Sequence, residues 1–172
     1  MHEVTDLAGI ARALSRVQRW NGDTIVPWTV LQHTLAGLAL IPDIEVVPAT
    51  YWMLHDSEES LTGDVPKPFK TAEQVTFGDA IRNQILKSMG LPAPDPGALA
   101  RIQVMDERLA AAEAQVLCPL KIRQAFPLYD EEAFKVVMGL LDMSPRQAIE
   151  EYLEAADRLL SLPTIKAMAR RA

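Results

Sequence analysis

The sequence is poor in cysteine and in basic residues. Cys118 is the only cysteine among 172 residues, so no disulfide can form within the chain and a reducing, cytoplasmic setting is expected. Seventeen lysines and arginines face 23 acidic residues, which gives a net charge of −6. This balance argues against a broad surface for a nucleic-acid polymer or a membrane, because phosphate-backbone binding depends on basic side chains. It leaves room for a local basic pocket that takes a small phosphorylated ligand.

Long apolar runs and strand-like patterns are also missing. The longest apolar run, around "LAGLALIP", is too short to span a bilayer. The opening "MHEVTDLAG" lacks the basic and apolar regions of a signal peptide, so we expect no export. The length of 172 residues and the hydrophobic content of 49% suit a single globular domain that spans residues 1–172 around one core.

Apolar residues recur at helical spacing along most of the chain, which predicts an all-α fold, a single compact helical bundle. Two capping-box patterns mark helix starts, at Thr29–Gln32 and Thr71–Gln74, and "SPRQ" opens the helix expected at 145–161. Prolines and glycines between the periodic segments indicate loops, among them 61–70. The expected helices are 5–18, 29–40, 48–60, 71–89, 95–117, 130–142, 145–161 and a short tail helix at 163–170.

Histidine is scarce, and two of the three histidines stand in apolar helical segments. His2 is close to the terminus and is expected to be solvated or disordered, whereas His33 and His55 interrupt apolar patterns. Taken singly, such a histidine is usually a hydrogen-bonded core residue. Asp56 follows His55 directly, and a buried carboxylate needs a cation or several hydrogen-bond donors. A divalent metal would serve this carboxylate and both imidazoles at once.

A second anomaly lies in the long helix predicted at 95–117. Asp106 and Glu113 fall on the same side as its apolar stripe, whereas a solvated helix places its acids on the opposite face. Asp106 is therefore a candidate inward-facing ligand; the alternative is a cap or a salt bridge, for which Arg101 and Arg108 are available. Two imidazoles and two carboxylates suit a divalent metal ion and do not distinguish Mn, Co, Zn, Mg, Fe or Ni. The stripe consists of Leu99, Ile102, Met105, Leu109, Ala112 and Val116.

The order H…HD…D on helices resembles the HD-domain metal-dependent phosphohydrolases. The flanking motifs "RW", "HDSEESLTGDVPKPFK" and "MDERLAAAE" are similar to those of the bacterial 5′-deoxynucleotidase branch and of phage dATP triphosphohydrolases. The resemblance covers about 15–115, and the helices at about 130–170 lie outside it. An HD dipeptide alone is a weak signal, but the composite HDxxExxxGDxPxPxK is specific. Gln32 departs from the pattern, since many members have Glu before the first His.

The resemblance implies roles for named residues. Glu59 matches an acid that positions or deprotonates the attacking water, or protonates the leaving oxygen; the alternative is a solvated acid, as we expect for Glu58. Asp64 matches a residue near the sugar or the leaving group, and the alternative is a turn residue. The implied metal ligands are His33, His55, Asp56 and Asp106.

Substrate contacts are implied for two basic stretches. Lys70 would reach a phosphate, and Lys67 would either add charge for a longer phosphate tail or be solvated. Arg19 suits a phosphate through its bidentate fork. Trp20 would stack on a base or line the sugar pocket, or else anchor the core. The two remaining tryptophans, Trp28 and Trp52, are assigned to packing.

The implied reaction is hydrolysis of the ester between the α-phosphorus and the 5′-oxygen of a nucleotide. A 5′-deoxynucleotidase acting on dNMP would release nucleoside and orthophosphate, and a dNTP triphosphohydrolase would release nucleoside and triphosphate by the same step. Two hypotheses without catalysis are a silent nucleotide-binding HD protein and a purely structural helical protein. The resemblance further implies a small-molecule nucleotide partner and a homo-oligomer, either a dimer or a hexamer. The expected location is the cytoplasm, or the host cytoplasm if the chain is phage-encoded.

Overall fold

The computed structural model describes residues 6–66, 69–127 and 129–170, and their regular structure is helical. The one β-type pairing in these ranges is an isolated antiparallel bridge between Gln18 and Thr29. The all-α prediction is confirmed. No helix in the described ranges has both the length and the apolar character needed to cross a membrane.

The helix starts follow the capping signals in the sequence. Both predicted capping boxes form, at Thr29 and Thr71, and a third forms at Ser144. Asp6, Asp95 and Asp130 each cap a further helix through the side chain. In chain order the helices are α1 (Leu7–Leu14), η1 (Trp20–Gly22), α2 (Val30–Leu40), α3 (Val46–Leu54), α4 (Glu59–Thr62), α5 (Ala72–Ser88), α6 (Pro96–Leu117), α7 (Leu120–Ala125), α8 (Glu131–Gly139), α9 (Pro145–Ser161) and α10 (Pro163–Ala169).

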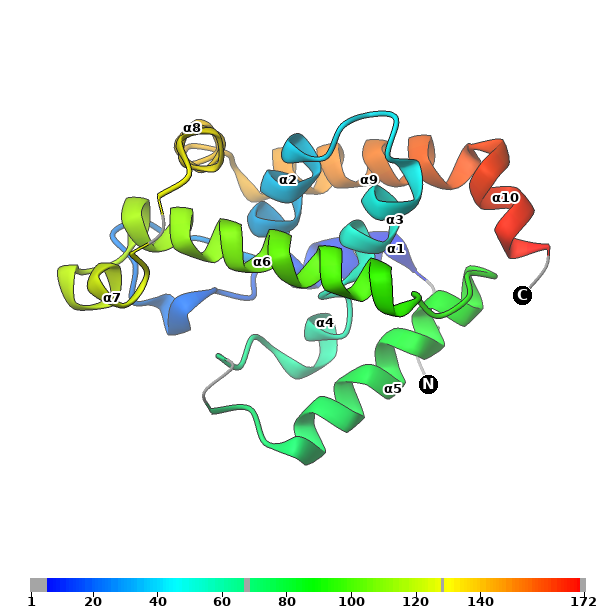
Figure 1. The fold of residues 1–172 in the computed structure, drawn as a ribbon, viewed down its shortest axis with the longest axis horizontal. Helices are drawn as coiled ribbons and strands as arrows, with labels where there is room; N and C mark the ends of the chain where they lie inside the picture. Colours follow the sequence, from blue (N-terminus) through cyan, green and yellow to red (C-terminus); the bar gives the residue numbers. More distant parts are fainter. Residues whose placement is uncertain (1–5, 67–68, 128, 171–172) are drawn as a thin grey trace.

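Helix α2 lies at the centre of the fold, in contact with α3, α6, α8 and α9. One apolar cluster joins α2 to α1, α3 and α9, and includes Leu14, Leu31 and Tyr152. A second cluster lies where α6 and α8 pack, and includes Leu109 and Val137. Figure 1 shows the long helix α6 passing in front of α2 and α3. Because apolar layers cover α2 on both sides, a polar residue in its middle is shielded from water.

The prediction of one helix over 48–60 is wrong. The chain leaves α-helical geometry after Leu54 and makes three-residue turns before α4 begins at Glu59. Two side chains favour this change, since His55 Nδ1 lies 2.6 Å from the carbonyl oxygen of Trp52 and Ser57 Oγ donates to that of Leu54. Side-chain bonds to the last carbonyls compete with the helical pattern. Because the chain turns here, the side chains of His55, Asp56 and Glu59 point in directions that a continuous helix would not give them.

Several helix boundaries also differ from the sequence expectations. Helix α1 is shorter than the predicted 5–18, and α7, which follows Pro119, is not among the expected helices. Tertiary side-chain bonds hold α7 in place, since Gln115 donates to carbonyls at Arg123 and Phe126. Helix α5 extends away from the other helices in Figure 1 at its N-terminal end, and its residues 72–77 are exposed.

Candidate metal centre

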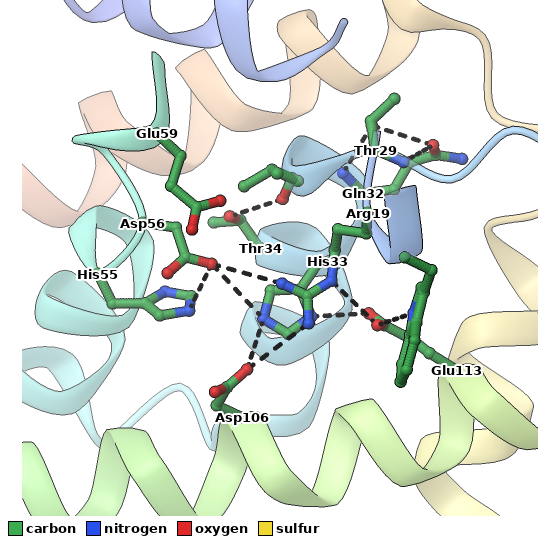
Figure 2. A network of polar contacts seen from close by, with 12 residues as sticks. Arg19, Thr29, Gln32, His33, Thr34, His55, Asp56, Glu59, Asp106 and Glu113 are labelled. Carbon is green, nitrogen blue, oxygen red and sulfur yellow. Dashed lines mark hydrogen bonds and ion pairs between the residues drawn. The ribbon is translucent and has the colours of Figure 1, made fainter. Parts of the chain in front are cut away.

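The structure brings the four sequence-predicted ligands together from three separate places in the chain. His33 lies in the middle of α2, His55 and Asp56 lie in the turn after α3, and Asp106 lies on α6 (Figure 2). The distance from His33 Nε2 to Asp106 Oδ1 is 3.4 Å, and that from His55 Nε2 to Asp56 Oδ2 is 3.0 Å. Ligand atoms of His33, His55 and Asp106 all lie within 4.8 Å of one another, which is close enough for one ion to contact all three.

Both imidazoles are oriented by a bond at Nδ1. His33 Nδ1 lies 2.7 Å from Glu113 Oε1, and His55 Nδ1 lies 2.6 Å from the carbonyl oxygen of Trp52. A carbonyl oxygen only accepts, so Nδ1 of His55 carries the proton and the neutral ring presents a lone pair at Nε2. Nε2 of both rings is buried and makes no hydrogen bond of normal geometry in the described residues. Metal-binding histidines are typically held in this way, with the second nitrogen bonded to an acceptor.

The charges around the cluster also suit a divalent cation. The guanidinium of Arg19 lies among three carboxylates. Its nitrogens are 3.7 Å from an oxygen of Asp56, 3.7 Å from one of Asp106 and 3.0 Å from one of Glu113. Buried carboxylates are costly unless their charge is compensated. The imidazole and carboxylate donors fit a divalent ion, which would add to the compensation that Arg19 provides.

The titration behaviour of the ligands reflects this crowding. Burial and Arg19 lower the pKa of His33, but Glu113 and Asp106 outweigh them and raise it to about 9. Without a metal ion His33 is therefore protonated at neutral pH, and it must lose this proton to become a ligand. Burial alone would raise the pKa values of Asp56 and Asp106, but the adjacent histidines and Arg19 hold both well below the usual range. Both carboxylates are therefore ionised at neutral pH, in the form that binds a metal.

Glu113 is a buried part of this centre to which the sequence analysis assigned no role. It lies two helical turns after Asp106 on α6 and has no solvent exposure. Its carboxylate contacts His33 Nδ1 and accepts from Arg19 Nε at 3.0 Å, Trp20 Nε1 at 3.1 Å and Trp28 Nε1 at 2.9 Å. Burial raises the pKa of Glu113, but Arg19 and His33 lower it to about 2. The sequence feature that could have identified Glu113 was its position on the apolar face of the predicted helix.

The segment that carries Arg19 and Trp20 has an unusual backbone. Trp20 and Asn21 have φ angles of 57° and 55°, in the left-handed region that non-glycine residues rarely occupy. Backbone bonds from Arg19 to Trp28 and from Val30 to Val17 fasten the segment to the start of α2. The half-buried Trp20 ring also makes an edge contact with Phe126, at a centroid distance of 5.2 Å. Residues held in such strained conformations are often found at functional sites.

The acids and lysines of the HD motif are placed as follows. Glu59 is 4% exposed and points toward Asp56 in Figure 2, so the alternative of a solvated acid is wrong. Burial and Asp56 raise the pKa of Glu59 to about 10, and its buried Oε2 has no hydrogen-bond partner among the residues that the structure describes. Lys70 Nζ lies 3.6 Å from the other carboxyl oxygen of Glu59. Asp64 is half-buried, and burial raises its pKa. Lys67 lies outside the described residues.

Glu58 does not face solvent as expected. It is 4% exposed, and its Oε1 accepts from Arg82 at 2.8 Å. Arg82 also donates to the carbonyl oxygen of His55, so the pair supports the turn that carries the HD dipeptide. Burial raises the pKa of Glu58 to about 7, although Arg82 lowers it.

The remaining residues considered in the sequence take packing or capping positions. Trp28 and Trp52 are buried, as predicted, and the Trp52 ring stacks on His55 at 4.0 Å between centroids. Gln32 completes the capping box of α2 and donates to the carbonyl of Leu140. Arg108 pairs with Asp130 and Glu132, whereas Asp106 contacts His33 and Arg19. A salt bridge between Arg108 and Asp106 is therefore not what the fold adopts.

A cavity of about 220 Å³ opens beside the HD dipeptide. His55, Asp56, Lys70 and Arg82 form part of its polar wall, and the remaining wall is mainly apolar. Apolar walls with a few convergent polar groups are typical of small-molecule sites. A separate hollow of about 340 Å³ lies between α3 and α6, and none of the predicted ligands lines it.

Comparison of the sequence with models of known protein families gave no match, and a search of curated protein sequences gave none.

Proposed function

We propose that this protein is a divalent-metal-dependent phosphohydrolase of (deoxy)nucleotides. It attacks the α-phosphorus and releases the nucleoside, with a deoxynucleoside monophosphate as the substrate. The observation that carries the proposal is the pair of buried imidazoles, each fixed at Nδ1 and each placing Nε2 beside a carboxylate, at 3.0 Å from Asp56 for His55 and at 3.4 Å from Asp106 for His33. The HDxxExxxGDxPxPxK motif around His55 supplies the reaction class by resemblance.

The residues that would hold the ion are His33, His55, Asp56 and Asp106. A divalent ion bound there supplies a Lewis acid that polarises the phosphoryl group and lowers the pKa of water. Glu59 is the candidate for moving a proton, because its buried Oε2 has no partner in the described residues and the side chain points toward Asp56. Arg19 orients the ligand carboxylates through its contacts with Asp56 and Asp106.

The charge balance supports a monophosphate more than a triphosphate. Arg19 is already surrounded by three carboxylates, and Lys70 lies near Glu59. Among the described residues, little positive charge is therefore left over for a tail of three phosphates; Lys67, which the sequence offers for such a tail, lies outside them. The triphosphohydrolase alternative is supported by one observation, which is that Lys70 lines the cavity beside His55 and Asp56 and could contact a longer tail there.

Product analysis tests the proposal. The protein is stripped with EDTA, reloaded separately with Mn²⁺, Co²⁺ or Zn²⁺, and incubated with the four dNMPs and the four dNTPs. Anion-exchange chromatography separates orthophosphate from triphosphate. We expect nucleoside and orthophosphate from at least one dNMP; release of triphosphate from a dNTP would instead establish the alternative. Metal binding without turnover of any nucleotide would refute the enzymatic proposal and favour a silent nucleotide-binding protein.

Matched variants test the ligand set. Asp106→Asn keeps the size of the side chain but removes the charge, and should abolish Mn²⁺ binding and turnover together. Glu107→Gln is the control, because Glu107 is the neighbouring residue on the exposed side of α6 and should leave both unchanged. Isothermal titration calorimetry measures the binding. Wild-type Mn²⁺ affinity in a folded Asp106→Asn variant would show that the ligands are wrong.

A further inference from the structure

Glu113 is saturated with donors. An ionised carboxylate has two oxygens with about four acceptor positions and no donor. In this protein Oε1 contacts His33 Nδ1 at 2.7 Å and Trp28 Nε1 at 2.9 Å, and Oε2 contacts Arg19 Nε at 3.0 Å and Trp20 Nε1 at 3.1 Å. Glu113 has no exposed side-chain surface, so water does not compete for these bonds. The position of the Glu113 side chain therefore fixes all four donors.

The two oxygens of Glu113 serve different parts of the site. Oε1 holds His33, so that the ring nitrogen facing Asp106 is Nε2. Oε2 holds the neighbouring Arg19 and Trp20, which precede α2 in a segment remote in sequence from Glu113. The carboxylate thus connects a metal-ligand position on α2 with the segment to which the HD resemblance assigns substrate contacts.

The segment that carries Arg19 and Trp20 needs such an anchor. Trp20 and Asn21 both have positive φ angles, 57° and 55°, that side-chain sterics disfavour. The amides of Gly22 and Asp23 close the turn on the carbonyls of Arg19 and Trp20. The Trp20 indole is the part of this turn that reaches the core, through Glu113 on one side and Phe126 on the other. Without the bond to Glu113, the ring would lose this hydrogen bond to the core and keep its apolar packing, which includes the edge contact with Phe126.

We propose that Glu113 is a positioning residue that fixes the ring of His33 and the Arg19–Trp20 segment with a single carboxylate. The catalytic part of this inference rests on the proposed function, but the positioning does not. Glu113 acts through the side chains that it holds, among them His33, Arg19 and Trp20. Loss of the carboxylate therefore weakens metal binding and displaces Trp20 at the same time, although the two lie on different segments.

Glu113→Gln is the direct test, because it keeps the shape and turns one acceptor oxygen into a donor NH₂ group. In either orientation of the amide, two of the four donors then face the NH₂ group, which is itself a donor. The first readout is the ¹⁵N–¹H spectrum of the three indole groups in EDTA-treated protein, assigned by single Trp→Phe variants. The signal of Trp20 or Trp28 should shift and exchange faster. Trp52 is the internal control, since its indole donates to the carbonyl oxygen of Thr34 and should be unchanged.

The second readout is the affinity for Mn²⁺ alone, by calorimetry. Removal of a group that orients a ligand typically costs about 10–100-fold in metal affinity, and we expect that loss in Glu113→Gln. Unchanged indole signals and unchanged Mn²⁺ affinity in a folded Glu113→Gln variant would overturn the positioning role. The same two results separate the proposals: if wild type lacks turnover but both effects are seen, only the enzymatic function fails.

Trp20→Phe provides a test that does not require Glu113→Gln to fold. It keeps a ring against Phe126 and removes one donor from Oε2. Amide hydrogen exchange at Gly22 and Asp23 should become about tenfold faster or more, while Mn²⁺ affinity, which depends on Oε1, stays within about twofold of wild type. If the enzyme turns over, KM should rise more than kcat falls. Unchanged exchange at both amides would show that Glu113 does not anchor the segment.

Discussion

Gly37 is the position at which the smallest substitution should do the most damage. It lies in α2 directly against the Trp52 ring, and a Cβ there would be 2.1 Å from Cε2 and 2.2 Å from Nε1 of that ring. Carbon atoms pack best at about 3.5–4.0 Å, so the ring or the helix would have to move by about 1 Å or more. Trp52 is 1% exposed, and its ring also stacks on His55 and donates to the carbonyl of Thr34, so a shift would disturb both contacts.

The cost of Gly37→Ala can be worked out from what Trp52 does. Overpacking of a filled core costs about 1–3 kcal/mol, and loss of the 2.8 Å bond from the indole to the carbonyl of Thr34 adds about 1 kcal/mol. The higher helix propensity of alanine returns about 1 kcal/mol. The expected net loss is about 2 kcal/mol, which corresponds to a fall in Tm of roughly 4–8 °C for a chain of this size. Because Trp52 stacks on His55, metal affinity should fall as well.

Urea unfolding of metal-free protein, followed by circular dichroism, measures the free energy of unfolding. Gly139→Ala is the matched control, because Gly139 is helical and a Cβ there meets nothing within 4 Å. It should leave stability unchanged or raise it by up to about 1 kcal/mol. If Gly37→Ala is as stable as Gly139→Ala, the close approach of α2 and the Trp52 ring is refuted.

Three further predictions concern residues outside the ligand set. Asp130 caps α8 and pairs with Arg108, so Asp130→Ala should lower the free energy of unfolding by about 1–2 kcal/mol. Asp130→Asn keeps the cap and should lower it by less. Equal losses for the two variants in urea melts would contradict the capping role. Burial raises the pKa of the Cys118 thiol to about 12, so iodoacetamide at pH 8 should modify it only through unfolding, whereas rapid labelling of native protein would disprove its burial. Burial raises the pKa of Glu58 to about 7 from an unfolded value near 4.5, so its contribution to stability is complete below pH 4.5 and is lost as the pH rises through 7. In EDTA, the stability of Glu58→Gln relative to wild type should therefore increase by about 3 kcal/mol between pH 4 and pH 8; a difference that does not change with pH would exclude this coupling.

The helical framework could be predicted from the sequence because its signals are local. A capping box needs only residues three apart, and those at Thr29 and Thr71 form as predicted. The helix predicted over 48–60 failed because side chains at His55 and Ser57 bond to the preceding carbonyls, and apolar periodicity carries no record of such bonds. Helix α7 was missed for a related reason, since bonds from Gln115 support it.

The sequence by itself determined the all-α class, most helix starts, and which histidines and acids were worth attention. The HD dipeptide and the inward-facing Asp106 stand out because charge on an apolar helix face is costly. Only the tertiary structure decided what each of these side chains meets. It placed His33 against Glu113 across 80 positions of sequence, buried Glu58 against Arg82, and surrounded Arg19 with three carboxylates. Such pairings depend on how helices pack in three dimensions, and the spacing of residues along a single helix does not specify them.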